Sequence, residues 1–421
     1  MSKKTLSVIG GGASGMAAAI EAARYVAKHK LNIEIVIYEK LSRAGKKILA
    51  TGNGRCNILN SSPTADKFYG NKKLINTVFD KYPVENNVEF FMSMGLYLTT
   101  EEDGRLYPLS LQAASVLDAL RFELEKLNVE TICDMPVTSI SRKDKGFMLN
   151  DSIYTDAVII AGGGKSSPVQ GSDGSCFNLL YSLGIRIKPT FPALTAIKLK
   201  NKDNTLKGVR AHGEILIVEN GKVIASDCGE IQYTDYGISG IPVMNISRFV
   251  SEHFQAHKKG KIIAAINVLP DFSPEEIFSY ILTRTKSNPD LLCENLLSGL
   301  MPKKLGISKL RAAGISEEIT IKSLTKNNIA VLTEIINSQI FEITGTMNFE
   351  NSQVTAGGAD STFFSYDTLE CSKINNLFAC GEILDVDAVC GGYNLTWAWS
   401  SGRCAGYNAI KKLSENTDAQ N

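Results

Sequence analysis

The sequence lacks the features that mark several classes of protein. No run of apolar residues approaches the roughly 18 that a membrane-spanning helix needs. The 45 basic and 44 acidic residues nearly balance, so no excess of positive charge points to nucleic acid or to an anionic membrane surface. The four histidines form no metal-ligand pattern, and none of the nine cysteines stands in a Cys-x-x-Cys pair. We therefore expect no membrane, nucleic-acid or metal partner.

We expect neither a signal peptide nor a disulfide framework. The first apolar run begins within a few residues of Met1, which leaves no room for a secretory leader. Scattered cysteines fit a reducing compartment, so we expect a cytoplasmic protein. The 421 residues are enough for two or three domains, and the sequence does not indicate an oligomeric state.

Glycine, in contrast, is placed near the N-terminus in a dinucleotide-binding pattern. A short apolar strand over 7–9 leads into Gly10, Gly12 and Gly15, and a helix rich in alanine follows over 16–24. In this Gly-x-Gly-x-x-Gly pattern the first glycine allows a tight turn, the second lets backbone approach a pyrophosphate, and the third lets the helix pack on the strand. The start of the helix then offers N–H groups and a positive dipole end to phosphate.

An acidic residue completes this nucleotide pattern. A second apolar run over 33–38 ends directly before Glu39. A carboxylate at the end of the second strand is placed to accept hydrogen bonds from a ribose. Strand, glycines, helix, second strand and Glu39 together predict a site for an ADP moiety.

A basic, glycine-rich segment follows Glu39 in place of the next helix of a plain NAD domain. Its lysines can offset phosphate charge, and its glycines let backbone pass close to a flat ligand. Flavoproteins extend the nucleotide fold in this way, with the segment running toward the flavin, so we expect FAD. The cofactor-binding candidates in it are Lys46, Lys47, Thr51, Gly52, Asn53, Gly54, Arg55, Cys56 and Asn57.

The far end of the chain carries a second glycine-rich junction between a strand and a helix. A short apolar strand over 376–380 ends in Gly381 and Glu382, and Gly391-Gly392-Tyr393 begins a helix. In FAD proteins of the glutathione-reductase type, an acid at such a strand end binds the ribityl chain, and we expect Glu382 to do so. The helix dipole would favour negative charge on a reduced ring. A third strand end adds the candidates Ala161, Gly162 and Gly163.

A Walker-like ending at Gly164-Lys165-Ser166 does not predict an NTPase. A P-loop needs a further glycine five residues before the second one. That position holds Ile159, inside a buried strand. The sequence therefore excludes a P-loop.

Several motifs together make the chain resemble a known family. They are Gly10–Gly15, Gly52-Asn-Gly-Arg-Cys-Asn57, 103–108, 233–240, 354–358 and 381–401. They resemble those of the BaiN/YhiN-type NAD(P)/FAD-dependent oxidoreductases, which are aminoacetone-oxidase-like flavoproteins. The resemblance implies that these residues lie near FAD: Ala13, Ser14, Glu39, Lys40, Val137, Glu382, Asp385, Asn394 and Leu395.

The resemblance also implies a three-part α/β architecture, which the middle of the chain supports. We expect a Rossmann-like FAD-binding domain of the glutathione-reductase type over 1–190 and 346–421. A β-rich substrate domain is expected over 191–270 and 338–345, and a small helical domain over 271–337. Local signals agree: Asn220-Gly221 predicts a hairpin, Ser273–Glu276 a capped helix start, and the runs 289–300 and 326–337 amphipathic helices.

The candidate catalytic residues are Arg55, Asn57 and Tyr393. Arg55 is able to bind an acidic or carbonyl substrate or a flavin carbonyl, and Tyr393 can serve as an acid or as a stacking wall. The sequence leaves open whether Cys56 and Cys390 form a redox pair. No second Gly-x-Gly-x-x-Gly follows in the middle third, so NAD(P)H, if used, must bind transiently.

Taken together, the residues predict an FAD-dependent oxidoreductase that acts on a small organic molecule. The first hypothesis is a reductase or dehydrogenase that acts on C=C or C–N bonds. An O₂-using amine oxidase is an alternative within enzymes. A flavin-containing binding or RNA-associated protein is the alternative outside them.

Overall fold

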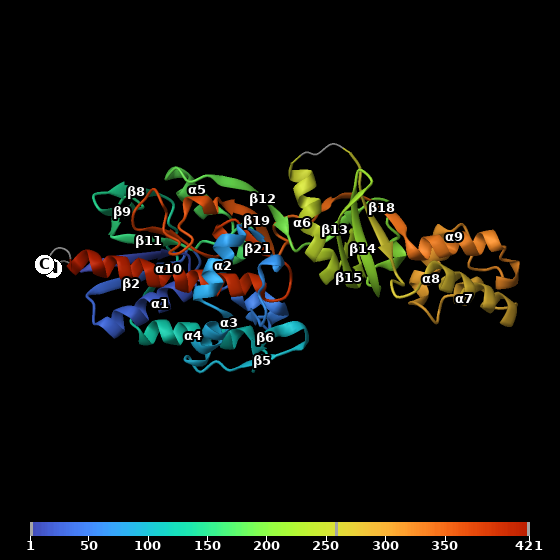
Figure 1. The fold of residues 1–421 in the computed structure, drawn as a ribbon, viewed down its shortest axis with the longest axis horizontal. Coiled ribbons are helices and arrows are strands. Elements are labelled where there is room, and N and C mark those ends of the chain that lie inside the picture. The colour runs from blue at the N-terminus through green and yellow to red at the C-terminus, as the bar shows by residue number, and fades with distance from the viewer. Residues whose placement is uncertain (1–2, 257–259, 419–421) are drawn as a thin grey trace. The chain divides into compact units, whose positions relative to one another are not determined.

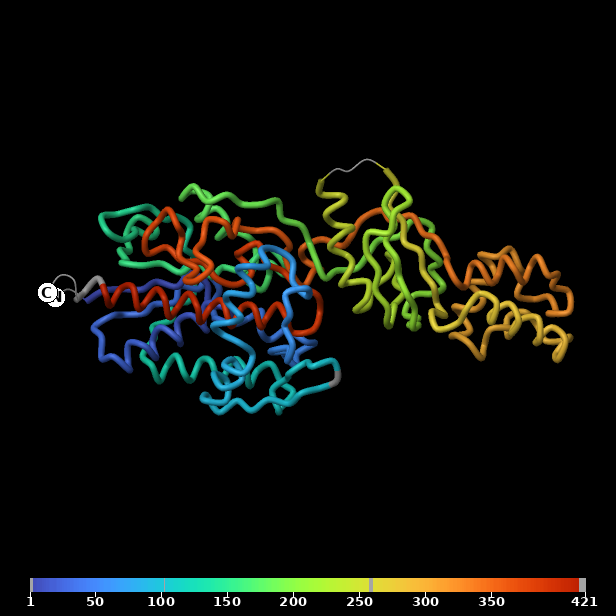
Figure 2. The backbone as a smooth tube through the Cα atoms, in the orientation of Figure 1, coloured from blue at the N-terminus to red at the C-terminus, as the bar shows by residue number. Residues whose placement is uncertain are grey.

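The computed structural model describes residues 3–256 and 260–418. The chain divides into two compact units, one formed by residues 1–190 with 353–421 and the other by residues 191–352 (Figure 1). The first unit thus combines the two ends of the chain, as the change of colour from blue to red within it shows (Figure 2).

A five-stranded parallel sheet lies at the centre of the first unit. Strand β1 pairs with β2 on one side and with β11 on the other, and β7 and β20 form the edges. Residues 6–9 of β1 and the whole of β11 are buried, because both faces of a parallel sheet are covered. This is the predicted Rossmann-type sheet, made of β1 (Lys4–Ile9), β2 (Ile33–Tyr38), β7 (Glu130–Ile132), β11 (Ala157–Ile160) and β20 (Leu377–Ala379).

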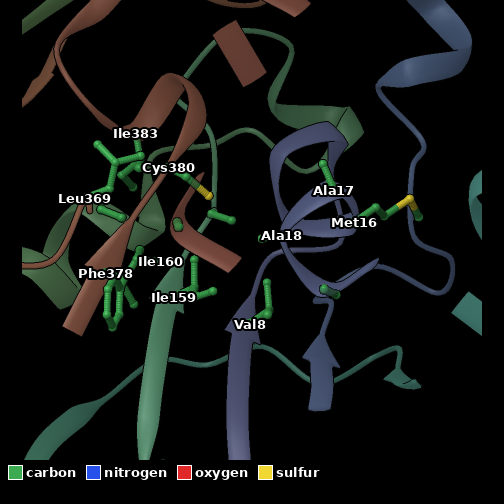
Figure 3. Close-up of a cluster of buried hydrophobic side chains, with 14 of the residues drawn as sticks. Val8, Met16, Ala17, Ala18, Ile159, Ile160, Leu369, Phe378, Cys380 and Ile383 are labelled. Carbon is green, nitrogen blue, oxygen red and sulfur yellow. The ribbon is translucent and has the colours of Figure 1, made fainter. Parts of the chain in front are cut away.

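Two helices from opposite ends of the chain pack together in this unit. They are α1 (Ala13–His29) and α10 (Tyr393–Asp418). A Cβ added at Gly402 would lie 2.3 Å from the carbonyl oxygen of Ser14, and one at Gly406 would lie 2.1 Å from that of Ala18. Small residues therefore let the two helices approach closely. Figure 3 shows the core around α1. The buried side chains of Val8, Ile159 and Phe378 come from the neighbouring strands β1, β11 and β20.

Smaller elements complete the first unit. The pair β4–β21 joins the two chain ends, short antiparallel sheets are formed by β3-β6-β5 and β8-β9-β10, and β12 pairs with β19. The strands are β3 (Leu59–Asn60), β4 (Phe68–Gly70), β5 (Leu98–Thr100), β6 (Arg105–Pro108), β8 (Ile140–Lys143), β9 (Gly146–Leu149), β10 (Ile153–Thr155), β12 (Ile187–Ala193), β19 (Val354–Ala359) and β21 (Val386–Ala388). The helices are α2 (Lys72–Lys81), α3 (Val84–Met92), α4 (Ala113–Lys126) and α5 (Ser175–Ser182).

The second unit is a closed β-barrel with helices that share its core. The barrel order is β13-β16-β15-β14-β17-β18, and barrel and helices bury their apolar side chains in one contiguous cluster. Its strands are β13 (Ile197–Leu199), β14 (Arg210–Glu219), β15 (Lys222–Tyr233), β16 (Gly237–Ser239), β17 (Ile262–Asn267) and β18 (Gln339–Thr346). Its helices are α6 (Ile241–Gln255), α7 (Pro274–Ser287), α8 (Lys303–Ala312) and α9 (Lys326–Asn337). The sequence-derived division of this insertion into two domains stays a prediction.

The local sequence signals in this unit predicted several elements correctly and one helix wrongly. Asn220 and Gly221, both at positive φ, turn β14 into β15 as predicted, and Ser273 caps α7 with a capping box. The helix predicted over 289–300 is wrong, because only the 3₁₀ turn Cys293–Asn295 forms there. Helix α8 begins after Pro302 instead. No helix among residues 3–256 and 260–418 combines the length and apolar character needed to span a membrane.

Candidate functional site

The glycine-rich segments lie at one edge of the parallel sheet. Strands β1, β2, β11 and β20 are neighbours; the first three end directly before a predicted segment, and β20 ends two residues before Gly381. The carboxyl ends of parallel strands share an edge, which is where such folds bind ligands. The structure therefore gathers Gly10–Gly15, Glu39, 161–163 and 381–382 at that edge.

The three glycines of the first turn have different surroundings. Gly10 has a φ of +107°, and an added Cβ would lie 2.6 Å from the Ala161 carbonyl oxygen. A Cβ on Gly15 would lie 1.9 Å from the carbonyl oxygen of Gly10. A Cβ on Gly12, in contrast, would meet no described atom within 4 Å. Gly12 therefore faces open space at the start of α1, where no side chain caps the helix.

The Glu39 carboxylate is buried beside this turn. Its Oε2 atom accepts a hydrogen bond of 2.9 Å from the Gly11 N–H, and Oε1 accepts one of 2.9 Å from the Leu41 N–H. A carboxylate oxygen can accept two hydrogen bonds. Glu39 is thus held rigidly and keeps capacity for two further donors.

The three lysines after Glu39 are engaged by protein groups. Lys40 forms an ion pair of 2.6 Å with Asp173, and Lys46 donates a hydrogen bond of 3.0 Å to the Val169 carbonyl. Lys47 donates one of 3.1 Å to Glu382. Lys40 and Lys46 therefore fasten the segment after β2 to the segment over 163–174.

Glu382 joins three segments of the first unit. Its Oε1 accepts from the Thr355 N–H at 2.7 Å, and its Oε2 accepts from Lys47 and from the Gly164 N–H at 3.3 Å. Oε1 accepts one hydrogen bond and Oε2 accepts two, so Oε1 keeps more capacity to accept a further one. Binding of a ribityl chain by Glu382 stays a prediction.

Ser172 is a candidate that the sequence reading missed. Its hydroxyl is buried and has no hydrogen-bond partner in the described chain. A Cβ added at Gly163 would lie 3.2 Å from this hydroxyl, and one at Gly171 would lie 3.8 Å from Glu39 Oε1. Because buried hydroxyls are normally hydrogen-bonded, the Ser172 hydroxyl is a candidate donor to a ligand near Glu39. The repeated glycines over 162–174 are the signal that could have indicated it.

The first and last glycine-rich segments meet through Asn57. With its amide nitrogen toward the carbonyls of Leu59 (3.0 Å) and Leu106 (3.2 Å), its oxygen accepts from the Gly392 N–H at 3.0 Å. Nearby, Asn60 donates to the Gly391 carbonyl at 2.9 Å. Residues 57–60 are therefore fixed directly against the start of α10.

Other predicted residues at this end have structural contacts of their own. The Asn394 amide accepts from the Ala388 N–H at 2.9 Å and donates to the Ala388 carbonyl at 2.9 Å, so it shapes the loop before α10. Asp385 pairs with Lys188 at 2.5 Å. Ser14 lies against Gly381, where an added Cβ would be 2.4 Å from its hydroxyl oxygen. The remaining predicted neighbours are the half-buried Ala13 and Leu395, packed against the core, and the buried Val137.

The segment over 51–56 turns sharply beside these contacts. Gly52, Asn53 and Gly54 all have positive φ, and the Cys56 N–H donates to the Thr51 carbonyl at 3.0 Å. Gly52 lies close to Asn57, whose N atom would be 2.7 Å from an added Cβ. The loop over 51–56 therefore packs against Asn57, which itself contacts the start of α10.

Arg55 is oriented by two residues that the sequence reading did not assign. Its guanidinium stacks over the ring of Tyr107, with 4.2 Å to the centroid, and forms an ion pair with Glu101. Its Nε atom is buried without a partner in the described chain. Tyr393 packs edge-on against Phe68, with ring centroids 5.9 Å apart.

The two cysteines considered as a redox pair lie in surroundings that disfavour the thiolate. Burial raises the pKa of Cys56 to about 11 and also raises the pKa of Cys390. Thiolate chemistry needs a lowered pKa, so their environments do not favour it. No cluster of His, Cys, Asp and Glu among residues 3–256 and 260–418 could hold a metal ion.

Comparison with known proteins agrees with this architecture. The chain is 36% identical over 412 residues to the 3-dehydro-bile acid delta(4,6)-reductase of Clostridium scindens, covering 97% of this chain and 99% of that protein. It is 27% identical over 405 residues to the ribosomal RNA dihydrouridine synthase of Escherichia coli, covering 94% and 95%. The model of the HI0933-like protein Rossmann domain matches residues 4–408. The chain therefore belongs to the HI0933-like family of flavoprotein oxidoreductases.

Proposed function

We propose that this protein is a reductase that uses FAD to transfer hydride to a small organic substrate. One observation carries the proposal: the open space at Gly12, at the uncapped start of α1 and next to Glu39, fits an ADP moiety. The relatives are consistent with reduction. One is named a reductase, and the other is named for dihydrouridine, a hydrogenated uridine.

The residues fit FAD along the whole edge of the sheet. Glu39 would accept from the ribose, the N-terminus of α1 would hold the pyrophosphate, and the unpartnered Ser172 hydroxyl would donate to the cofactor near Glu39. Lys47 and Glu382 would stabilise the loops around it. At the other end, residues 391–395 with Asn57 would face the flavin ring.

When bound, FAD supplies hydride transfer, and the protein supplies position and electrostatics. The positive end of α10 would favour negative charge at the ring. Arg55, held by Tyr107 and Glu101, would present its guanidinium to a carbonyl or carboxylate. Tyr393 would bound the substrate space or donate a proton.

The electron donor is tested by anaerobic mixing of the purified yellow protein with NADH or NADPH. We expect rapid bleaching of the flavin absorbance with one of them. Absence of bleaching by both, together with hydrogen peroxide formation from amines in air, would support the amine-oxidase alternative and overturn the reductase.

An RNA substrate is the second candidate, because relatives at 27% and 25% identity are named ribosomal RNA dihydrouridine synthases. The near balance of 45 basic and 44 acidic residues disfavours it, but a local surface can still bind RNA. Filter binding of ribosomal RNA across a salt series would decide. Tight binding whose affinity falls steeply with salt would favour this candidate over the small molecule.

A further inference from the structure

A cavity unconnected with the predicted flavin residues lies inside the second unit. It has a volume of about 190 Å³ and lies where β13, β15 and β18 meet α8. A single water takes up about 30 Å³ in the liquid, so the cavity has room for a compound of several heavy atoms. Its apolar walls include Leu199, Leu206 and Phe341.

The wall of this cavity contains a buried hydroxyl without a partner. Tyr233, the last residue of β15, is 5% exposed, and its Oη makes no hydrogen bond within the described chain. Leaving a buried donor unsatisfied is unfavourable, and buried tyrosine hydroxyls usually find a partner. Tyr233 is one of the residues that line the cavity, so we consider a ligand in the cavity as the partner of its hydroxyl.

Further polar groups line the same cavity. Gln339 is one of them, and its amide oxygen accepts a hydrogen bond of 2.8 Å from the buried Lys309. Arg311 donates from Nε and Nη2 to Glu317, and within the described residues its Nη1 atom makes no hydrogen bond. A neighbouring hollow that shares Arg311 is also lined by Lys207 and Lys304.

The charges at this end favour an anion with a defined orientation. Although burial alone would raise it, hydrogen bonds from Thr205 and Ser308 hold the pKa of Asp203 below its usual range. Asp203 is therefore a fixed negative charge that a ligand carboxylate must avoid. Arg311 offers a positive charge and the donors of its Nη1 atom to a carboxylate, since its Nε and Nη2 atoms are bonded to Glu317.

We propose that this cavity is a second ligand-binding site, which takes a small cyclic carboxylate. The carboxylate would pair with Arg311, the ring would pack among Leu199, Leu206 and Phe341, and a polar substituent would meet the Tyr233 hydroxyl. The site does not depend on the proposed flavin chemistry, because all its residues belong to the second unit.

The test uses the full-length protein and three probes, which are benzoate, 4-hydroxybenzoate and the neutral benzamide. Binding is measured by calorimetry and by ligand-observed NMR. We expect saturable binding of both acids, with 4-hydroxybenzoate tighter by about 3- to 10-fold, the range of one neutral hydrogen bond. Benzamide should bind at least about tenfold more weakly than benzoate, because it lacks the charge that pairs with Arg311.

Variants separate this site from adventitious binding. Tyr233→Phe, which removes only an unpartnered hydroxyl, should fold normally and abolish the preference for 4-hydroxybenzoate. Arg311→Gln should weaken both acids by about tenfold. Lys222→Gln, at the start of β15, is the matched control and should change neither. Absence of saturable binding, or an unchanged preference in Tyr233→Phe, would overturn the proposal.

Discussion

Replacing Gly12 with alanine separates cofactor binding from folding. Gly12 has φ −86° and ψ −167°, an extended conformation that alanine adopts readily. Since an added Cβ meets no described atom within 4 Å, the apoprotein should keep its stability. We expect a gain of about 0.4–1 kcal/mol at most, because alanine restricts the unfolded chain more than glycine does.

The same methyl group should strongly weaken FAD binding. It would occupy the space that we assign to the pyrophosphate at the start of α1. Loss of two hydrogen bonds to a charged group costs about 3–6 kcal/mol, which corresponds to roughly two to four decades in Kd. Quenching of FAD fluorescence on titration with apoprotein measures the Kd, and thermal unfolding of the apoprotein measures stability.

Gly15→Ala is the matched control for this prediction. Its Cβ would lie 1.9 Å from the Gly10 carbonyl oxygen, so the apoprotein itself should be destabilised. The reasoning is refuted if Gly12→Ala binds FAD as tightly as the wild type does. It is also refuted if Gly12→Ala unfolds as readily as Gly15→Ala.

Three further predictions follow from the same structure. Glu39→Ala should weaken FAD binding by about one to two decades. It should also lower the apoprotein Tm, because the Gly11 and Leu41 N–H groups lose their acceptor. An unchanged Kd for FAD would show that Glu39 does not belong to the site. The flavin released by denaturation should run as FAD on chromatography, and FMN would contradict the ADP site. Burial lowers the pKa of Lys309 to about 7 from 10.5, so the folded protein binds fewer protons than the unfolded chain between these pH values and its stability rises with pH there. Lys309→Met should therefore raise the free energy of unfolding by on the order of 3 kcal/mol at pH 6 and by much less above pH 10. Urea unfolding at the two pH values measures this difference. An equal gain at both pH values would contradict the lowered pKa of Lys309.

The sheet and its glycine-rich edge could be predicted from the sequence because their signals are local. The apolar run over 33–38, the spacing from Gly10 to Gly15 and the position of Glu39 each require only neighbouring residues. Parallel pairing then places the strand ends together without further information. The two chain ends could be assigned to one unit for the same reason.

The contacts that orient the site could not be predicted in this way. Glu101 on Arg55 and Ser172 beside Gly163 depend on how distant loops pack, which no local period records. The error over 289–300 has a similar cause. That segment has helical apolar spacing, but the N–H groups of Cys293 and Glu294 donate to the carbonyls of Ile319 and Glu317, so only one 3₁₀ turn forms.

A crystal structure of the purified holoprotein tests the central claim most directly. The account predicts one FAD whose ribose is hydrogen-bonded to Glu39, whose pyrophosphate lies against Gly12, and whose ring faces residues 391–395 and Asn57. A flavin held by only one end of the chain, or a side chain of the protein filling the space at Gly12, would contradict it.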